Sequence, residues 1–241
     1  MMRILVTRPE PDNTELKRFI EQHGHHAYAA PMLAFKELDV VWPDLNDYDT
    51  VVTTSKNAVR LFSKNQENRE IPLYTVGEQS AELARENGFA TVVSGPGSVK
   101  GLIDVIQQED FEKPLLYIRG EHITVDLKTF LYRHHVDELV IYEMLENIEL
   151  PEDALRALEN QDIDVVLFYS LRTAKSFFTA IENLSESDAV KEGLKRTIAL
   201  CLGESVIEYV SKKHQGFIEK IDNPSQVQLL ETLENFKLVT E

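Results

Sequence analysis

The sequence has one cysteine, no long hydrophobic run and a deficit of basic residues. Cys201 lies in the apolar stretch Ile198–Leu202 and has no partner for a disulfide, as expected of a buried thiol in a reducing compartment. No apolar stretch reaches the roughly eighteen residues of a membrane-spanning helix. The N-terminus enters an apolar strand pattern almost at once, so no signal peptide is expected. These absences favour a cytoplasmic protein.

The shortage of positive charge restricts the ligands. The chain of 241 residues has 25 Lys and Arg against 41 Asp and Glu, which gives a formal net charge of −16. Nucleic-acid binding is disfavoured, because it requires a basic surface. An anionic ligand would be repelled at long range. Such a ligand would have to be held by local donors, such as helix N-termini and a few well-placed cations.

The sequence also lacks the usual nucleotide-binding loops. There is no Walker A motif, and Gly95-Pro96-Gly97-Ser98 does not have the G-x-G-x-x-G spacing of a dinucleotide site. Because this segment follows a predicted strand and precedes a predicted helix, we expect a tight turn with Ser98 as the helix cap. A nucleotide-dependent enzyme is therefore disfavoured.

Histidines are clustered in two places without other metal-binding side chains at ligand spacing. His23, His25 and His26 form one cluster, and His134 and His135 form the other. Both clusters fall at the ends of predicted helices, where histidine can bond the last carbonyls. No metal site is expected.

What the chain does contain is an internal repeat. Three pairs of segments match in the same order, with an offset that grows slowly along the chain: Ile4–Arg8 with Leu115–Arg119, Val52–Ser55 with Leu167–Ser170, and Val76–Glu78 with Leu202–Glu204. Two similar units are therefore expected, and ligands commonly bind in clefts between such units.

Short apolar runs alternate with amphipathic segments, as in α/β units on parallel sheets. Strands are predicted over 3–8, 27–30, 50–55, 72–77, 90–94, 114–119, 137–143, 164–169, 197–203 and 216–221. Helices are predicted over 12–23, 57–64, 78–88, 98–108, 124–135, 152–160, 172–183, 187–195, 204–213 and 225–236. Predicted N-caps are Asn13 or Thr14, Ser98 and Ser225.

Proline-marked breaks near 34–47 and 143–153 fall at equivalent places in the two copies. They leave two chain paths open. Either each copy forms one consecutive unit, or the chain crosses between units at the breaks, so that the N-terminal βαβ segment joins the C-terminal part.

Polar and glycine residues gather at the carboxyl ends of the predicted strands, where ligands bind in open α/β sheets. These residues are Thr7, Arg8, Thr54, Ser55, Lys56, Asn57, Gly77, Arg119, Gly120, Ser170, Arg172, Thr173 and Gly203. Helix N-termini there offer unpaired N–H groups to carboxylates or phosphates. Short polar residues also occur there simply as helix caps, but their recurrence in both copies favours a binding site.

With these residues in view, the chain resembles the uroporphyrinogen-III synthase family along almost its whole length. The resemblance rests on short motifs in the family's order: Leu5–Pro9, Thr54–Val59, Val76-Gly77 with Ser80-Ala81, Val140–Tyr142, Phe168–Ser170 and Leu202-Gly203. It adds Ser80 and Ser205 to the candidate substrate-binding residues. It implies an α/β fold of two similar lobes, with parallel sheets flanked by helices, joined by a two-stranded linker. The implied lobes are residues 1–35 plus 146–241, and 36–145.

The resemblance implies a cytoplasmic, monomeric lyase of haem and tetrapyrrole biosynthesis that needs no cofactor or metal. Its substrate would be hydroxymethylbilane, a linear tetrapyrrole with eight carboxylates, cyclised to uroporphyrinogen III with loss of water and inversion of ring D. Transient contact with the upstream bilane-forming enzyme is a further expectation, and a non-catalytic two-lobe small-molecule sensor is the alternative. Tyr142 occupies the family's tyrosine position and would protonate the departing hydroxide.

The repeat adds two expectations about this site. Arg8 should face Arg119, and Ser55 should face Ser170, across the cleft. Tyr142 has no phenol at its repeat position near Ala30-Pro31, so the chemistry is expected where the symmetry fails.

Overall fold

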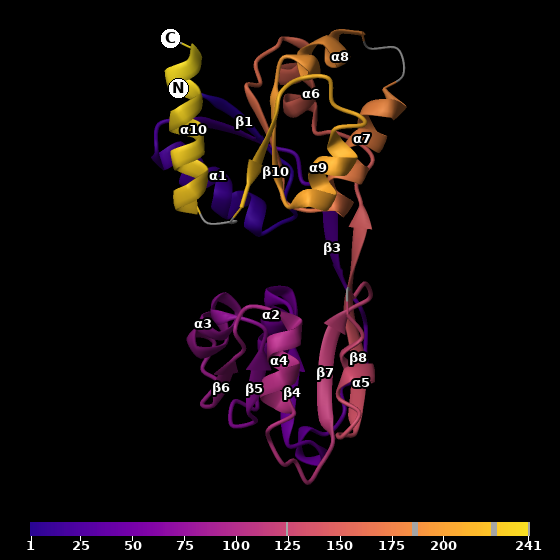
Figure 1. Cartoon of the computed structure of the whole chain (residues 1–241). Coiled ribbons are helices and arrows are strands. Elements are labelled where there is room, and N and C mark those ends of the chain that lie inside the picture. Colours follow the sequence, from indigo (N-terminus) through magenta and orange to yellow (C-terminus); the bar gives the residue numbers. More distant parts are fainter. Residues whose placement is uncertain (124, 185–187, 223–225, 241) are drawn as a thin grey trace. The chain divides into compact units, whose positions relative to one another are not determined.

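The computed structural model describes residues 1–123, 125–184, 188–222 and 226–240, and the chain forms two compact units (Figure 1). Unit 1 contains Met1–Phe35 and Leu145–Glu241, and unit 2 contains Lys36–Met144. The chain therefore leaves unit 1 once and returns to it once.

Unit 1 is built on a five-stranded sheet with the order β11-β10-β9-β1-β2. Its strands are β1 (Arg3–Val6), β2 (His26–Ala29), β9 (Val165–Phe168), β10 (Ile198–Leu202) and β11 (Ile218–Ile221). All four neighbouring pairs are parallel. Because β1 pairs with β9, the indigo N-terminal segment of Figure 1 shares a sheet with the last third of the chain.

Helices cover both faces of the unit 1 sheet, which makes it a three-layer α/β unit. They are α1 (Asp12–Gln22), α6 (Glu152–Glu159), α7 (Leu171–Asn183), α8 (Asp188–Lys195), α9 (Glu204–Val210) and α10 (Gln226–Thr240). One face packs Leu5 and Phe168 against α6 to α9, and the other packs Ile4 and Leu167 against α1 and α10. Strand β9 is apolar at all four positions because both of its faces are buried.

Unit 2 is built on a six-stranded sheet with the order β3-β8-β7-β4-β5-β6. Its strands are β3 (Leu33–Glu37), β4 (Thr50–Thr53), β5 (Leu73–Thr75), β6 (Val92–Ser94), β7 (Leu115–Gly120) and β8 (Val136–Glu146). The pairs β4–β5, β4–β7, β5–β6 and β7–β8 are parallel. Their carboxyl ends therefore meet at one edge.

The helices of unit 2 are α2 (Lys56–Asn65), α3 (Glu78–Glu86), α4 (Val99–Ile106), the single turn α5 (Leu127–Phe130) and the short 3₁₀ helix η1 (Leu45–Asp47). Leu102 and Ile106 of α4 pack with Leu127 on a core that includes Val52 and Tyr117. The predicted cap Ser98 is confirmed, since its hydroxyl accepts from the N–H of Gly101 at 3.1 Å.

Apart from β3, the two units have the same strand order, so the sequence repeat is also a repeat of structure. Reading β11-β10-β9-β1-β2 in unit 1 and β6-β5-β4-β7-β8 in unit 2 brings the repeated segments onto equivalent strands. Segment Ile4–Arg8 contains most of β1, and its repeat partner Leu115–Arg119 contains most of β7. The predicted fold class, two similar α/β units with parallel sheets and flanking helices, is confirmed.

Several predicted elements need correction. The helix predicted over 124–135 is only α5, because the chain turns after Phe130, buries Leu131 and enters β8 at Val136; residue 124 lies outside the described residues. Strand β3 begins just before the segment 34–47, which is predicted as a break, and overlaps its first residues.

The predicted cap at Asn13 or Thr14 is wrong, and the predicted cap Ser225 lies outside the described residues. Helix α1 begins after Pro11, whose fixed φ suits a helix start. The amide of Asn13 is turned inward and donates to the carbonyls of Val6 and Arg8, both at 2.8 Å. It therefore ties the helix to the end of β1.

Candidate functional site

In unit 2, the polar strand-end residues gather around the start of α2. Ser55 follows β4 and caps this helix, because its Oγ accepts from the N–H of Asn57 at 3.1 Å. Its own N–H donates to Thr53 Oγ1 at 3.3 Å. Asn57 Oδ1 accepts from Arg60 at 2.8 Å. Ser55 is therefore fixed by its own N–H, which bonds the Thr53 hydroxyl, and by its side chain, which bonds the backbone of Asn57.

The same hydroxyl meets Tyr142 from β8. The phenol of Tyr142 donates to Ser55 Oγ at 2.8 Å, and the residue is only 9% exposed. Burial raises the pKa of this phenol above its ordinary value, while the bond with Ser55 opposes part of the rise. Tyr142 therefore carries its proton throughout the neutral pH range.

Gly120 makes room for the Tyr142 ring. The register between β7 and β8 shifts between Arg119 and Gly120, which places Gly120 opposite Tyr142. A Cβ at position 120 would lie 2.6 Å from Cζ, 2.7 Å from Cε2 and 2.9 Å from the phenol oxygen. Since no real Cβ contact is that short, glycine is required here for space.

A second phenol at this edge was missed by the sequence reasoning. The hydroxyl of Tyr117 on β7 lies 3.3 Å from Thr54 Oγ1, and burial raises its pKa. The repeat holds a signal that could have found it, because the counterpart of Tyr117 is Val6. A phenol stands where the other copy has an aliphatic side chain.

Two further candidates in unit 2 are the basic residues Arg119 and Lys56. Arg119 Nη1 donates to the carbonyl oxygens of Gly120 at 2.9 Å and Glu121 at 3.1 Å, and Nε pairs with Glu138 at 3.3 Å. Lys56 lies half-buried in the first turn of α2. The guanidinium of Arg119 is thus bonded to carbonyl groups at the end of β7 and to a carboxylate on the neighbouring strand β8.

Gly77 and Ser80 belong to the start of α3, next to the Gly95–Ser98 turn. Gly77 is the N-cap, and the N–H of Ser80 donates to its carbonyl at 3.1 Å. The N–H groups of Gly95 and Gly97 donate to Thr75 and Val76 at 2.7 and 2.9 Å. Because these donors are used internally, the turn is not a phosphate cradle.

In unit 1, the equivalent strand ends carry Thr7 and Arg8. Thr7 is fully buried and its hydroxyl donates to the carbonyl of Leu167. Arg8 pairs with Asp12, and its guanidinium carbon lies 4.8 Å from the centroid of the Tyr169 ring. Burial raises the pKa of Tyr169 to about 12. The position of the Arg8 guanidinium is therefore fixed by the Asp12 carboxylate and the face of the Tyr169 ring.

The other candidates in unit 1 lie at helix starts. Ser170 caps α7 and accepts from the N–H of Thr173 at 3.1 Å, with the Thr173 hydroxyl 2.7 Å away. Arg172 Nε lies 3.4 Å from Glu146. Gly203 has a φ of 86°, which favours glycine, and Ser205 is exposed on the first turn of α9. The start of α9 is therefore formed by a glycine and an exposed hydroxyl.

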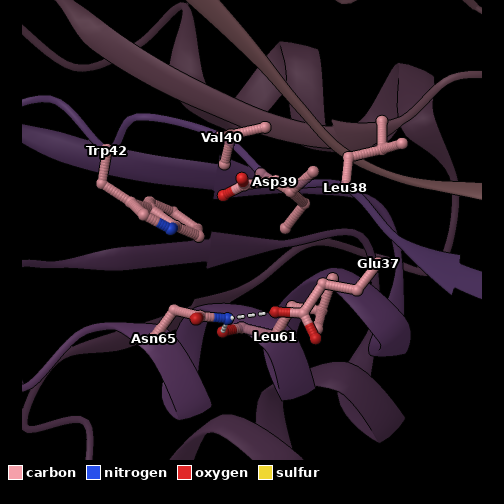
Figure 2. Close-up of a pocket in the computed structure, with 8 residues that line it drawn as sticks. Glu37, Leu38, Asp39, Val40, Trp42, Leu61 and Asn65 are labelled. Atoms are coloured by element: carbon pink, nitrogen blue, oxygen red, sulfur yellow. Dashed lines mark hydrogen bonds between the residues drawn. The ribbon is translucent and has the colours of Figure 1, made fainter.

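A cavity of about 390 Å³ lies elsewhere in unit 2, beside the C-terminal half of α2. Figure 2 shows the side chains that line it. The cavity is lined by Glu37, Leu38, Asp39, Val40, Trp42, Leu61, Asn65 and Ile141. Glu37 accepts from Asn65 at 2.9 Å and from Lys64 at 2.6 Å. Two carboxylates on its wall make this cavity a poor site for a polycarboxylate.

The described part of the chain contains no group of three or more His, Cys, Asp or Glu side chains that could hold a metal ion. His23 Nδ1 lies 2.8 Å from the carbonyl of Phe19, as expected at a helix end. Cys201 is fully buried, and burial raises the pKa of its thiol to about 12. Among the described residues, no helix is long and apolar enough to cross a membrane.

Comparisons with known proteins agree with one another. A family model described as Uroporphyrinogen-III synthase HemD matches residues 14–216. A uroporphyrinogen-III synthase from Chlorobaculum parvum is 24% identical over 207 residues, covering 79% of this chain and 84% of that protein.

Two solved structures share the fold. Uroporphyrinogen-III synthetase from Helicobacter pylori has a TM-score of 0.64 at 19% identity, over 98% of this chain and all of that one. A mutant uroporphyrinogen III synthase from Thermus thermophilus has a TM-score of 0.55 at 17% identity, over all of both chains. With the family model matched over most of its length, this chain belongs to the uroporphyrinogen-III synthase family, the lyases of tetrapyrrole biosynthesis that cyclise hydroxymethylbilane to uroporphyrinogen III with loss of water and inversion of ring D.

Proposed function

We propose that this chain carries out the family reaction at its strand ends, and that Tyr142 supplies the proton for the departing hydroxide. The observation that supports this role is the Tyr142 phenol, buried and protonated beside a helix N-terminus and bonded to Ser55. A proton donor must be protonated at working pH, which a phenol with a raised pKa is. The family membership gives no support to a non-catalytic sensor.

Loss of hydroxide from the ring A hydroxymethyl group leaves an azafulvene. Attack by the substituted carbon of ring D gives a spiro intermediate, and fragmentation and reclosure give the type III isomer. Because the bilane also closes unaided to the uninverted isomer, much of the catalysis lies in holding a conformation.

The substrate carboxylates are proposed to bind at the helix starts. Ser55 and Ser170 cap α2 and α7, and Gly77 and Gly203 are the N-caps of α3 and α9. Unpaired N–H groups and the positive end of the helix dipole suit carboxylates at such places. Lys56, Arg8 and Arg172 add positive charge nearby, and Asn57, Ser80 and Ser205 add polar groups. That Arg8 faces Arg119, and Ser55 faces Ser170, stays a prediction from the repeat.

We further propose that the protein acts as a monomer in the cytoplasm, without a cofactor or metal, and touches the bilane-forming enzyme only transiently. The lone buried thiol and the acidic surface agree with a cytoplasmic location. Analytical ultracentrifugation with and without that enzyme would test the oligomeric state and the contact.

The test of Tyr142 is the isomer made from hydroxymethylbilane. Tyr142→Phe should slow type III formation on the order of 10²-fold, the lower range for general acid catalysis, and let spontaneous type I product accumulate. Tyr48→Phe is the matched control, since that phenol donates to Asp137 at 3.1 Å near the amino ends of β4 and β8. An unchanged rate and isomer ratio in Tyr142→Phe would remove Tyr142 from the mechanism.

A further inference from the structure

The Ser55 hydroxyl has both of its acceptor positions occupied. It accepts the N–H of Asn57 at 3.1 Å and the phenol of Tyr142 at 2.8 Å. A hydroxyl oxygen has two lone pairs and one proton, so two accepted bonds leave only the proton to be given away. Within the described ranges, no acceptor for that proton is found. Ser55 is half-buried, so the proton is available to a ligand.

Tyr142 is less exposed than Ser55, which is half-buried. The tyrosine is 9% exposed, and the ring lies against the backbone of Gly120. A proton donor must come within about 2.6–3.2 Å of the departing oxygen. A substrate oxygen that approaches the start of α2 meets Ser55 Oγ before it reaches the phenol.

The order of acidity fits this arrangement. A phenol is a far stronger acid than an aliphatic alcohol, so Tyr142 is the donor in the pair and Ser55 the acceptor. The equivalent cap in unit 1 differs at this point, because the Ser170 hydroxyl lies against the hydroxyl of Thr173. Two aliphatic hydroxyls provide no acid at neutral pH. Of these two caps, the Ser55 cap is the one with a phenol bonded to it.

We propose that Ser55 is the catalytic residue that touches the departing oxygen, and that Tyr142 delivers its proton through the Ser55 hydroxyl. This relay rests on the proposed function and deepens it. The carbon–oxygen bond of the hydroxymethyl group breaks with its electron pair on oxygen, and the pyrrole ring supplies the electrons of the new double bond. The oxygen takes the Ser55 proton and leaves as water, while the Tyr142 proton moves to Ser55 Oγ. The proton released when ring D regains aromaticity returns through Ser55 to the phenolate.

Helix α2 contributes to the relay through its dipole. The ten-residue helix begins directly after its N-cap Ser55, so the positive end of its macrodipole lies at this hydroxyl. This positive end favours negative charge that develops on the oxygens there. Burial raises the pKa of Tyr142, and the hydrogen bond with Ser55 lowers it in part. The bond therefore favours the phenolate that the relay forms. Both effects assist the transfer.

The test replaces Ser55 and measures the type III rate and the isomer ratio. Ser55→Ala should lower the rate by the same order as Tyr142→Phe, on the order of 10²-fold. Ser55→Thr keeps a hydroxyl and should retain most of the rate. The double variant Ser55→Ala/Tyr142→Phe should be no slower than Tyr142→Phe alone, because both residues serve one transfer.

Loss of the helix cap must be separated from loss of the relay. Ser98→Ala removes an equivalent cap from α4 in the same unit and should lower the melting temperature with little effect on the isomer ratio. If Ser55→Ala does not fold, Ser55→Gly replaces it, because glycine at an N-cap costs only a few tenths of a kcal/mol.

The outcomes separate the relay from the function it rests on. The relay is wrong if Ser55→Ala or Ser55→Gly keeps the rate within about threefold while Tyr142→Phe is slow; the phenol then acts directly. It is also wrong if the double variant shows the product of the two losses, or if folded Ser55→Thr is as slow as Ser55→Ala. An unchanged Tyr142→Phe overturns the proposed acid and the relay together.

Discussion

The substitution Gly120→Ala tests the space that holds Tyr142. Position 120 has no positive φ, so alanine adds a methyl group without backbone strain. That Cβ would lie 2.6 Å from Cζ of Tyr142, and an ordinary contact needs about 3.4 Å. The ring must therefore shift by about 0.8 Å. A shift of that size stretches the 2.8 Å bond between Tyr142 and Ser55 beyond hydrogen-bonding distance.

The cost can be worked out from these contacts. Overpacking of a core position costs about 1–3 kcal/mol, and the lost hydrogen bond adds about 1 kcal/mol. For a chain of this size each kcal/mol lowers the melting temperature by about 2–4 °C. Gly120→Ala should melt roughly 4–16 °C lower, and its product should shift toward the type I isomer.

Calorimetry and product analysis of the same preparations would measure both effects. In a Tyr142→Leu background, Gly120→Ala should cost much less stability, because the smaller side chain leaves room for the methyl group. Activity should not return in that double variant. A Gly120→Ala protein with the parent melting temperature and isomer ratio would refute the reasoning.

Two further predictions concern unit 1. A Cβ at Gly193 in α8 would lie 1.9 Å from the carbonyl oxygen of Leu158 in α6, so Gly193→Ala should lower the free energy of unfolding by about 3 kcal/mol, the upper end of the usual cost of overpacking. A loss below about 1 kcal/mol in urea unfolding would contradict that close approach. The Cys201 thiol has a pKa raised to about 12 by burial, so at pH 8 it should react with a thiol reagent only after denaturation, and rapid labelling of the native protein would show the burial to be wrong.

Much of the fold could be predicted from the sequence. The repeat indicates two similar units, and the apolar runs place the buried parallel strands within them. The run Val165–Phe168 is apolar at every position, and the structure buries all of it as β9. The hydrophobic pattern alone does not predict strand β3, because its sequence, LAFKE, has a half-exposed pattern and borders a proline-marked break. Only the family resemblance, with its two-stranded linker, implies strands at the breaks. The pairing of β3 with β8 is a long-range contact that no local pattern specifies.

The candidate site could be predicted only at the level of the strand ends. Ser55 and Tyr142 were both candidates, but their hydrogen bond joins residues 87 positions apart. The role of Gly120 depends on a register shift between β7 and β8, which creates the slot for the ring. Thr7 was predicted as a binding residue because it is polar and ends a strand, but its buried hydroxyl donates to the carbonyl of Leu167 within the sheet. Side-chain direction at a strand end depends on neighbours that are far away in the sequence.

The pairing of β1 with β9 has a consequence for synthesis on the ribosome. Arg3 and Asp164, which are bonded through the N–H of Arg3 at 2.7 Å, lie 161 residues apart. At about 5–20 residues per second, the first strand waits roughly 8–32 s for its neighbour to be made. Unit 2 is continuous in sequence and can fold in that interval. Within the N-terminal βαβ segment, Ile4 and Val6 can already pack against α1. Leu5 packs against helices α6 to α9, so that face of β1 stays uncovered until the rest of unit 1 has been made.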